Sequence, residues 1–265
     1  MRTDYETLKL DRVDDHILIV TLNRPDAANA MNTQMGLDLR DLWRDLYVDP
    51  AEARCVILTG SGDKAFCAGG DLKERKGMTV EAWQRQHAIF EQALMTMMDV
   101  PAPIIAAVNG AAYGGGTEFT LAADFAYGSR NARFALTEVT LGIMPGAMGT
   151  QNLPRAVGIR RAKEFLLTGK PCTADEAQEW GILNKVLDDR EQLMAAAIET
   201  ARTIAGNAPI SIRQAKKALN VATQVDLKTG YFFEIEAYNR MVPTEDRQEG
   251  INAFNEKRKP VYKGR

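Results

Sequence analysis

The sequence predicts an α/β domain in which strands and helices alternate, followed by a helical C-terminal region. Three short apolar runs are nearly continuous, which is typical of strands that are covered on both faces. After about residue 153 the pattern changes to one helix after another. The three runs are residues 16–22 (HILIVTL), 55–58 (CVIL) and 104–108 (IIAAV).

Two amphipathic helices are expected between these strands, because apolar side chains recur there at helical spacing and form one face. His87 lies within the second stripe and His16 begins the first strand, so we interpret both histidines as structural. The first stripe contains Met31, Met35, Leu39, Leu42 and Leu46, and the second contains Val80, Trp83, His87, Phe90, Leu94 and Met97.

Helix signals dominate the C-terminal part of the chain. Thr173 and Glu176 have the spacing of a capping box, and Pro209 suits the first turn of a later helix. A further stripe predicts a helix in that region, and the longest strand pattern is confined to residues 183–187. This stripe contains Ile212, Ala215, Leu219 and Ala222.

Composition limits the classes of function. The 265 residues are 45% hydrophobic and 26% charged, with a net charge of −2, which is ordinary for a soluble protein. The balance provides no general attraction for nucleic acid or for an anionic membrane, so an anionic ligand must be held locally. No segment approaches the ~20 apolar residues of a membrane span, and the acidic N-terminus does not resemble a targeting signal, so we expect a cytoplasmic protein.

The cysteines and glycines exclude several kinds of site. Cys55, Cys67 and Cys172 are widely spaced, which supports neither a disulfide framework nor a zinc site. Cys67 has no partner in a recognisable motif, so nucleophilic catalysis is not favoured. The glycines form neither a P-loop nor a dinucleotide-binding fingerprint, and therefore ATP and NAD are not indicated.

The most informative segment places two glutamates after a glycine-rich turn. An apolar strand leads to Gly114, Gly115 and Gly116, where the backbone can approach a ligand and then begin a helix. Free N–H groups at such a helix start suit a carbonyl oxygen that gains negative charge. Glu118 follows two residues later and Glu138 twenty residues after that, which suggests an acid/base pair beside an oxyanion hole.

Both glutamates also have simpler interpretations. Glu118 would complement the helix dipole from the first turn, and Glu138 would pair with a neighbour such as Arg133. If the two carboxylates share a partly buried pocket, burial and repulsion should raise at least one pKa towards neutrality. Such a pair can give and take protons, and it titrates as a unit.

The chain resembles the crotonase (enoyl-CoA hydratase/isomerase) superfamily, in six segments that follow the family order. The resemblance implies repeated ββα units over residues 1–200 and a helical oligomerisation region over residues 201–265, which forms trimers or hexamers. The segments are NRPDAANAMN from Asn23, DKAFCAGGDLKE from Asp63, AAVNGAAYGGGTEF from Ala106, LTEVTLGIMPGAMGTQ from Leu136, RAKEFLLTGK from Arg161, and DRQEGINAFNEKRKP near the C-terminus.

The resemblance implies a 2-enoyl-CoA hydratase that adds water across C2=C3 without a prosthetic group. By that likeness Glu118 and Glu138 are catalytic, the N–H groups of Gly70 and Gly115 form the oxyanion hole, and Gly146 helps to seat the water. Coenzyme A would enter as part of the substrate. The positions that match its binding path are Asp26, Ala27, Ala28, Ala68, Gly70, Asp71, Leu72 and Lys73, with Phe254 and Lys257 reaching the CoA of a neighbouring subunit.

Other activities remain alternatives at this point. One alternative is a 3,2-enoyl-CoA isomerase, which generally works with one carboxylate. The C-terminal sequence is also similar to that of the methylglutaconyl-CoA hydratase branch. The rival from another class is a non-catalytic protein that uses the scaffold for assembly or for RNA binding, and the acidic balance argues against RNA binding. Met148 replaces a glycine that is usual in the family, so it would either narrow the acyl pocket or reshape the turn.

Overall fold

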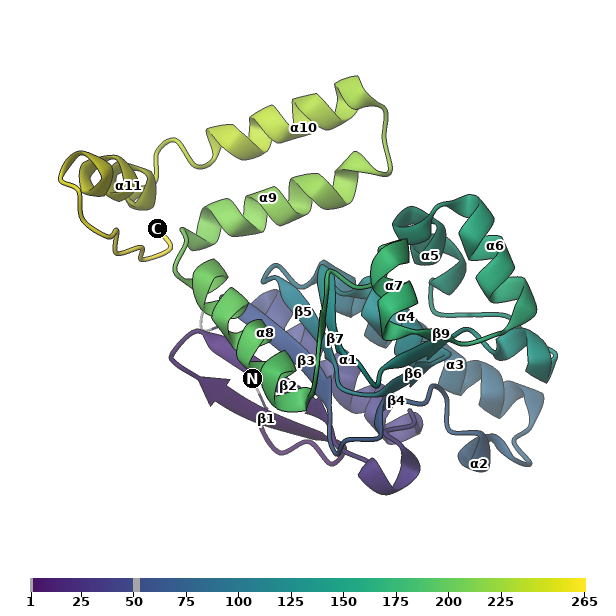
Figure 1. The fold of residues 1–265 in the computed structure, drawn as a ribbon. Helices are drawn as coiled ribbons and strands as arrows, with labels where there is room; N and C mark the ends of the chain where they lie inside the picture. The colour runs from purple at the N-terminus through teal and green to yellow at the C-terminus, as the bar shows by residue number, and fades with distance from the viewer. Residues whose placement is uncertain (1, 50–52) are drawn as a thin grey trace.

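The computed structural model describes residues 2–49 and 53–265, which form two sheets with helices packed around them (Figure 1). The larger sheet has the order β1-β2-β3-β5-β7-β10, and only its β1–β2 pair is antiparallel. Its strands are β1 Leu8–Val13, β2 Ile17–Leu22, β3 Cys55–Gly60, β5 Ile104–Val108, β7 Phe125–Ser129 and β10 Lys185–Leu187. The smaller sheet contains β4 Ala65–Cys67, β6 Ala111–Tyr113, β8 Arg133–Ala135 and β9 Cys172–Thr173.

Successive strands alternate between the two sheets. The first strand of each pair, β3, β5 or β7, joins the larger sheet, and the second, β4, β6 or β8, joins the smaller one. Helices follow the pairs, so the expected repeats of two strands and a helix are confirmed. The helical segments up to the last pair are η1 Pro25–Ala27, α1 Thr33–Val48, α2 Leu72–Arg75, α3 Val80–Asp99 and α4 Gly115–Ala122, and η2 Glu138–Leu141 follows β8.

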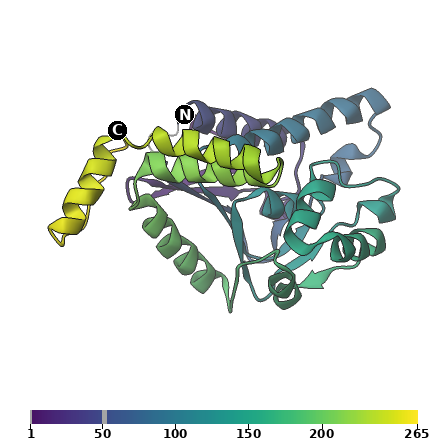
Figure 2. The same ribbon diagram turned by 90° about the horizontal axis from the view of Figure 1, so that it is seen from above.

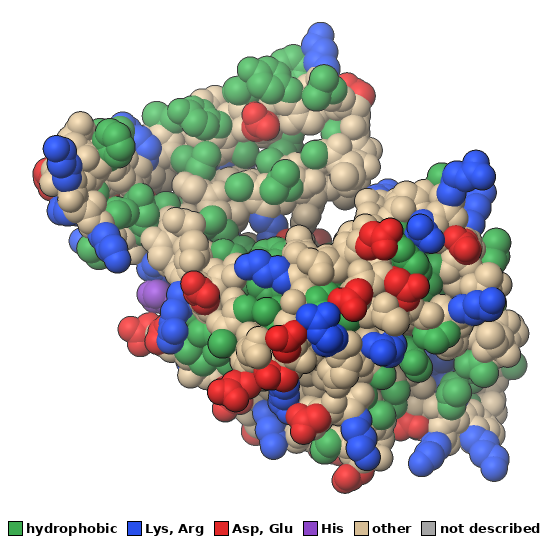
Figure 3. All heavy atoms as spheres, in the orientation of Figure 1, with side chains coloured by type: hydrophobic (Ala, Val, Ile, Leu, Met, Phe, Trp, Pro, Cys, Tyr) green, Lys and Arg blue, Asp and Glu red, His purple; other side chains and the backbone are tan. Residues whose placement is uncertain are grey.

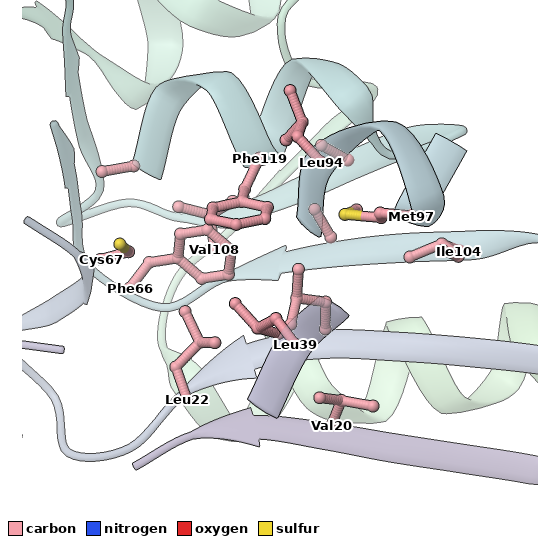
Figure 4. Close-up of a cluster of buried hydrophobic side chains, with 14 of the residues drawn as sticks. Val20, Leu22, Leu39, Phe66, Cys67, Leu94, Met97, Ile104, Val108 and Phe119 are labelled. Atoms are coloured by element: carbon pink, nitrogen blue, oxygen red, sulfur yellow. The ribbon is translucent and has the colours of Figure 1, made fainter. Parts of the chain in front are cut away.

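Both faces of the larger sheet are covered, as the continuous apolar strands predict. Val56 and Leu58 of β3 face one core cluster, whereas Cys55 and Ile57 face another that includes Leu193 of α8 (Arg190–Ala205). Figure 4 shows the first cluster, in which side chains of α1, α3 and α4 meet those of the strands. Burial of side chains of this size typically contributes 1.5–3 kcal/mol each.

Local signals place the helix ends. Asn32 accepts a hydrogen bond from the N–H of Met35, so α1 begins at Thr33 and Met31 lies outside it. The capping box of Thr173 and Glu176 is formed, and Pro209 stands in the first turn of its helix, as predicted. The remaining helices are α5 Gly149–Val157, α6 Ile159–Thr168, α7 Ala174–Trp180, α9 Pro209–Ala222, α10 Leu227–Asn239 and α11 Glu245–Asn255.

The last three helices form an arm that extends from the body. Figures 1 and 2 show α9 and α10 side by side, with α11 farther out. Apolar side chains gather over this part of the surface in Figure 3. Leu219 of α9 and Phe232 of α10 are 71% and 59% exposed. Residue 200 lies within α8, which packs on the sheet, so the division into residues 1–200 and 201–265 stays a prediction. None of the helices in the described ranges is long and apolar enough to cross a membrane.

Candidate active site

Two glycine-rich turns meet where β4 and β6 end. Gly69 follows β4 with φ +84° and Gly114 follows β6 with φ +51°, a region that favours glycine. A Cβ on Gly69 would lie 3.2 Å from the amide nitrogen of Gly115, and a Cβ on Gly116 would overlap the carbonyl oxygen of Cys67. The close approach of the two turns therefore requires backbone without side chains.

The amide groups of Gly70 and Gly115 both lie at this junction. Gly115 is the first residue of α4, where a helix leaves its N–H without an intrahelical partner. Within residues 2–49 and 53–265, no group accepts a hydrogen bond from either N–H. Both residues line the same cavity, so the two donors are available to a ligand there.

Glu118 is held in place from the first turn of α4. The side chain is buried, and its Oε1 accepts hydrogen bonds from the N–H groups of Ala147 at 2.8 Å and Gly149 at 2.9 Å. Its Oε2 accepts none from the described part of the chain, which leaves that oxygen for a ligand. Burial raises the pKa of Glu118 to about 7, the charge of Glu138 raises it as well, and the two N–H groups oppose the shift.

Glu138 reaches the same cavity from the start of η2. Its Oε1 lies 3.0 Å from the position that a Cβ on Gly114 would occupy. Its Oε2 is buried without a hydrogen-bond partner among the described residues, and burial raises the pKa of this carboxyl group. A buried oxygen without a partner indicates a group that awaits a ligand or a proton. Arg133 donates to backbone carbonyls instead, so the simpler pairing with Glu138 is not formed.

The cavity has a volume of about 420 Å³ and two kinds of lining. We call the first the inner lining: Gly69, Gly70, Gly114, Gly115, Glu118, Glu138 and Ala147. We call the second the outer lining, which consists of side chains from α2, α3, η2 and the segment after it: Leu72, Arg75, Trp83, His87, Phe90, Leu141, Ile143 and Met144. The first presents backbone amides and carboxyl groups, and the second presents mostly apolar surface.

The structure brings all five predicted catalytic positions together at one cavity. Glu118, Glu138, Gly70, Gly115 and Gly146 all line the cavity. The hydrogen bonds to Glu118 come from Ala147 and Gly149, the two neighbours of the Met148 position, rather than from Gly146.

The predicted CoA positions divide into two groups. Ala68, Gly70 and Leu72 line the cavity, whereas Asp26, Ala27, Ala28, Asp71 and Lys73 do not. The carboxylate of Asp71 caps α2 through the N–H groups of Lys73 and Glu74, and it accepts a hydrogen bond from Arg24 at 2.9 Å. These contacts lower the pKa of Asp71 against the opposing effect of burial and give the side chain a structural role.

Phe254 and Lys257 lie on the arm, away from the cavity of their own chain (Figure 1). Phe254 is 83% exposed, and Lys257 follows α11 with φ +56°. A role at the cavity of a neighbouring subunit stays a prediction.

The backbone conformation of Met148 indicates which effect this residue has. The residue stands at φ +66° before α5, is 36% exposed and is not part of the cavity lining. Of the two alternatives from the sequence, the structure favours the turn over the acyl pocket, because glycine adopts this left-handed conformation at little cost.

The interpretation of His87 as structural was incomplete. Its imidazole lines the cavity, lies 3.2 Å from Glu91 Oε1, and occupies the space that a Cβ on Gly146 would need. The sequence also did not indicate Arg75, Trp83, Ile143 or Met144 as lining residues. Helical spacing identifies the face that His87 and Phe90 share, but it does not reveal what that face meets.

Cys67 takes no part in a nucleophilic site. The thiol is fully buried, and burial raises its pKa to about 11. A thiol that stays protonated and packs in the core is inert, as expected from the sequence.

Comparisons with known proteins bear on the family and on the fold. The family described as enoyl-CoA hydratase/isomerase has a model that matches residues 12–265. The chain is 41% identical to a short-chain-enoyl-CoA hydratase of Clostridium acetobutylicum over 92% of each chain. It is 37% identical to the human mitochondrial enoyl-CoA hydratase domain-containing protein 2, covering 95% of this chain and 87% of that protein. The crystal structure of an enoyl-CoA hydratase from Bacillus anthracis superposes with a TM-score of 0.96 at 43% identity, over 98% of this chain and all of that one.

Proposed function

The chain belongs to the enoyl-CoA hydratase/isomerase family, and we propose that it adds water reversibly across the C2=C3 bond of a 2-enoyl-CoA thioester. It is a hydro-lyase that acts on a CoA thioester. The observation that carries the proposal is a buried Glu118 with a pKa of about 7, which shares a cavity with Glu138 and two free backbone N–H groups. These are the parts that the reaction needs.

The oxyanion hole consists of the N–H groups of Gly70 and Gly115. Attack of water on C3 moves electron density to the thioester oxygen, which becomes an enolate oxygen. Two fixed donors stabilise that charge without reorganisation, and the start of α4 adds its dipole. Loss of one such donor typically costs about 10²-fold or more in rate.

The two glutamates divide the proton transfers. Oε2 of Glu118 accepts a proton from the water as its oxygen bonds to C3, and Glu138 gives a proton to C2. The reverse division of labour is the alternative. A pKa near 7 suits either role, because a group of this kind is present in both protonation states at neutral pH. The N–H groups of Ala147 and Gly149 orient the first carboxylate.

The CoA part of the substrate follows the surface beside the second glycine turn. Ala68, Gly70 and Leu72 line the cavity. In the proposed path the CoA continues from there over Asp26, Ala27, Ala28, Asp71 and Lys73. Ala28 and Ala68 are neighbours, because the N–H of Ala68 donates a hydrogen bond to the carbonyl oxygen of Ala28 at 3.1 Å. No prosthetic group takes part in the scheme.

The enzyme assembles as a trimer or as a hexamer of two trimers. The apolar side chains of α9, α10 and α11 that are exposed in one chain support this, because surfaces of that kind usually serve as interfaces. Phe254 and Lys257 would then reach the CoA of a neighbour. Light scattering at micromolar concentration should give the mass of three or six chains, and a clean monomer would contradict both statements. A cytoplasmic location stays a prediction, because one of the relatives is mitochondrial.

The test of the activity is the loss of enoyl absorbance when the protein meets 2-enoyl-CoA thioesters of different chain length. Hydration predicts a 3-hydroxyacyl-CoA that mass spectrometry finds 18 Da heavier than the substrate. A 3-enoyl-CoA supplied in parallel separates the isomerase alternative, which would produce a 2-enoyl-CoA of unchanged mass. Binding of RNA without turnover of any thioester would instead favour the scaffold, and such binding should weaken steeply with salt.

A further inference from the structure

Arg75 is a positive charge in a cavity that otherwise presents carboxyl groups and apolar surface. It is the last residue of α2, which begins directly after the turn of Gly69 and Gly70. A Cβ on Gly70 would lie 3.2 Å from both Cζ and Nη1 of Arg75. The guanidinium group is therefore next to the backbone that forms the oxyanion hole, on the side of the outer lining.

The guanidinium group is held by a hydrogen bond along one edge and by two aromatic rings, with its Cζ 5.4 Å from the centroid of the Phe90 ring. Its Nε donates to Oε1 of Gln86 at 2.8 Å, and it stacks over the Trp83 ring at 4.2 Å from the ring centroid. Gln86 is buried and is itself fixed, because its Nε2 donates to Thr33 at 2.8 Å and to Glu74 at 2.7 Å. This arrangement leaves Nη1 and Nη2 as the edge that has no partner among the described residues.

Arg75 also forms no ion pair with a carboxylate of the described ranges. The charge of the nearby Glu74 acts on it without direct contact, because Oε2 of Glu74 is used for Gln86 and for the N–H of Thr33. Burial lowers the pKa of Arg75 and the charge of Glu74 raises it in part, and the guanidinium group stays protonated at neutral pH. A partly buried cation without a counter-ion is costly, and a planar pair of donors fits a carboxylate best.

From this geometry we infer that the preferred substrate is a 2-enoyl-CoA whose acyl chain carries a carboxylate at the end away from the thioester, and that Nη1 and Nη2 of Arg75 bind this carboxylate. The inference rests on the proposed hydratase function and names its substrate class. An acyl chain that ended in a methyl group would leave the guanidinium group without a counter-ion. The apolar side chains of Leu141, Ile143 and Met144 would contact the carbons between the double bond and the carboxylate.

The test compares substrates that differ only in a terminal methyl or carboxylate group. The pairs are 2-pentenoyl-CoA with glutaconyl-CoA, and 2-hexenoyl-CoA with 2,3-dehydroadipyl-CoA. For at least one pair, kcat/KM of the wild-type enzyme should be about 10-fold or more higher with the carboxylate, as expected for a bidentate charged contact. A preference for the methyl-ended member in both pairs would overturn the inference.

The matching variants are Arg75→Gln and Arg85→Gln. Arg75→Gln should lower kcat/KM for the carboxylated member about 10- to 100-fold more than for its methyl-ended partner, chiefly through KM. Arg75→Lys should recover part of this difference, because lysine keeps the positive charge but lacks the planar pair of N–H donors. Arg85→Gln removes an exposed charge from the neighbouring helix α3, outside the cavity, so it should leave the ratio unchanged. Equal losses on both substrates in Arg75→Gln would mean that Arg75 only supports the turn.

Binding of saturated analogues separates this inference from the hydratase function. Calorimetry with glutaryl-CoA and pentanoyl-CoA needs no turnover. Tighter binding of glutaryl-CoA to the wild-type protein, abolished in Arg75→Gln but not in Arg85→Gln, would support the carboxylate site even if no thioester were hydrated. Hydration of all enoyl thioesters with equal binding of the two analogues would keep the proposed function and overturn the role of Arg75.

Discussion

The inner lining of the cavity consists of backbone amides and two carboxyl groups, whereas the outer lining consists of side chains from helices and from the segment after η2. Glu118 is 4% exposed and accepts two backbone hydrogen bonds. Leu141 and Met144 of the outer lining are 53% and 60% exposed. In the proposed scheme, the groups that perform chemistry are held by the main chain, whereas the groups that contact the acyl chain are side chains. Substitutions can therefore test the two linings separately.

The largest expected effect comes from the carboxyl groups of the inner lining. Glu118→Gln and Glu138→Gln keep size and polarity but remove the exchangeable proton, so each should lower hydration about 10²-fold or more. The double variant should lose much less than the product of the two factors, because the residues act as a unit. Steady-state kinetics would measure this, with CoA binding and circular dichroism as controls. Full turnover in Glu118→Gln, with none in Glu138→Gln, would favour isomerisation.

A substitution at Gly146, where the two linings meet, should reduce the activity less than loss of either glutamate. A Cβ on Gly146 would overlap the imidazole of His87, so Gly146→Ala should displace that ring and reduce kcat/KM about 10-fold. The double variant Gly146→Ala with His87→Ala should recover most of the loss, because the overlapping ring is absent. Gly206→Ala is the matched control, since Gly206 has a right-handed helical backbone outside the cavity. No recovery in the double variant would place the defect in the turn itself.

Burial of Glu118 should also appear in the pH dependence of stability. Burial raises its folded-state pKa to about 7 from the ordinary 4.5, so the folded protein binds more protons than the unfolded chain between these values. The free energy of unfolding should therefore fall as the pH rises from about 4.5 to about 7. Urea midpoints of the wild-type protein and of Glu118→Gln would isolate this contribution, because other groups are common to both. If the urea midpoints of the two proteins changed with pH in the same way, the raised pKa of buried Glu118 would be contradicted.

The smallest effect is expected at Met148, outside both linings. Met148→Gly should stabilise the protein by about 1 kcal/mol or less, because glycine adopts φ +66° without strain but loses more entropy on folding. The ranking of acyl substrates should stay unchanged, since the side chain does not line the cavity. Thermal unfolding would measure the change in stability, and kcat/KM for a series of 2-enoyl-CoA thioesters would measure the ranking of substrates. A broader range of substrates would show that the side chain reaches the cavity during turnover.

Much of the inner lining could be predicted from the sequence, because its geometry is local. Gly114, Gly115 and Gly116 form a turn into a helix, and Glu118 follows within the first turn of that helix, so a few adjacent residues determine its position. The strands at residues 16–22, 55–58 and 104–108 were recognised for a related reason. Their continuous apolar pattern reflects burial on both faces, which the structure confirms.

Only the tertiary structure decided what the helices face. The spacing of His87 and Phe90 identifies one side of α3, but the register of the sheets and the turn after η2 bring Gly146 against that side. Arg75 faces the cavity because buried Gln86 and Trp83 hold its guanidinium group, a contact between separate helices. Backbone conformation along a short segment is set by its own residues, whereas contacts between distant segments depend on the packing of the whole chain. The sequence alone therefore determined the family and the glycine-rich turn before Glu118, and the tertiary structure decided which side chains form the outer lining of the cavity.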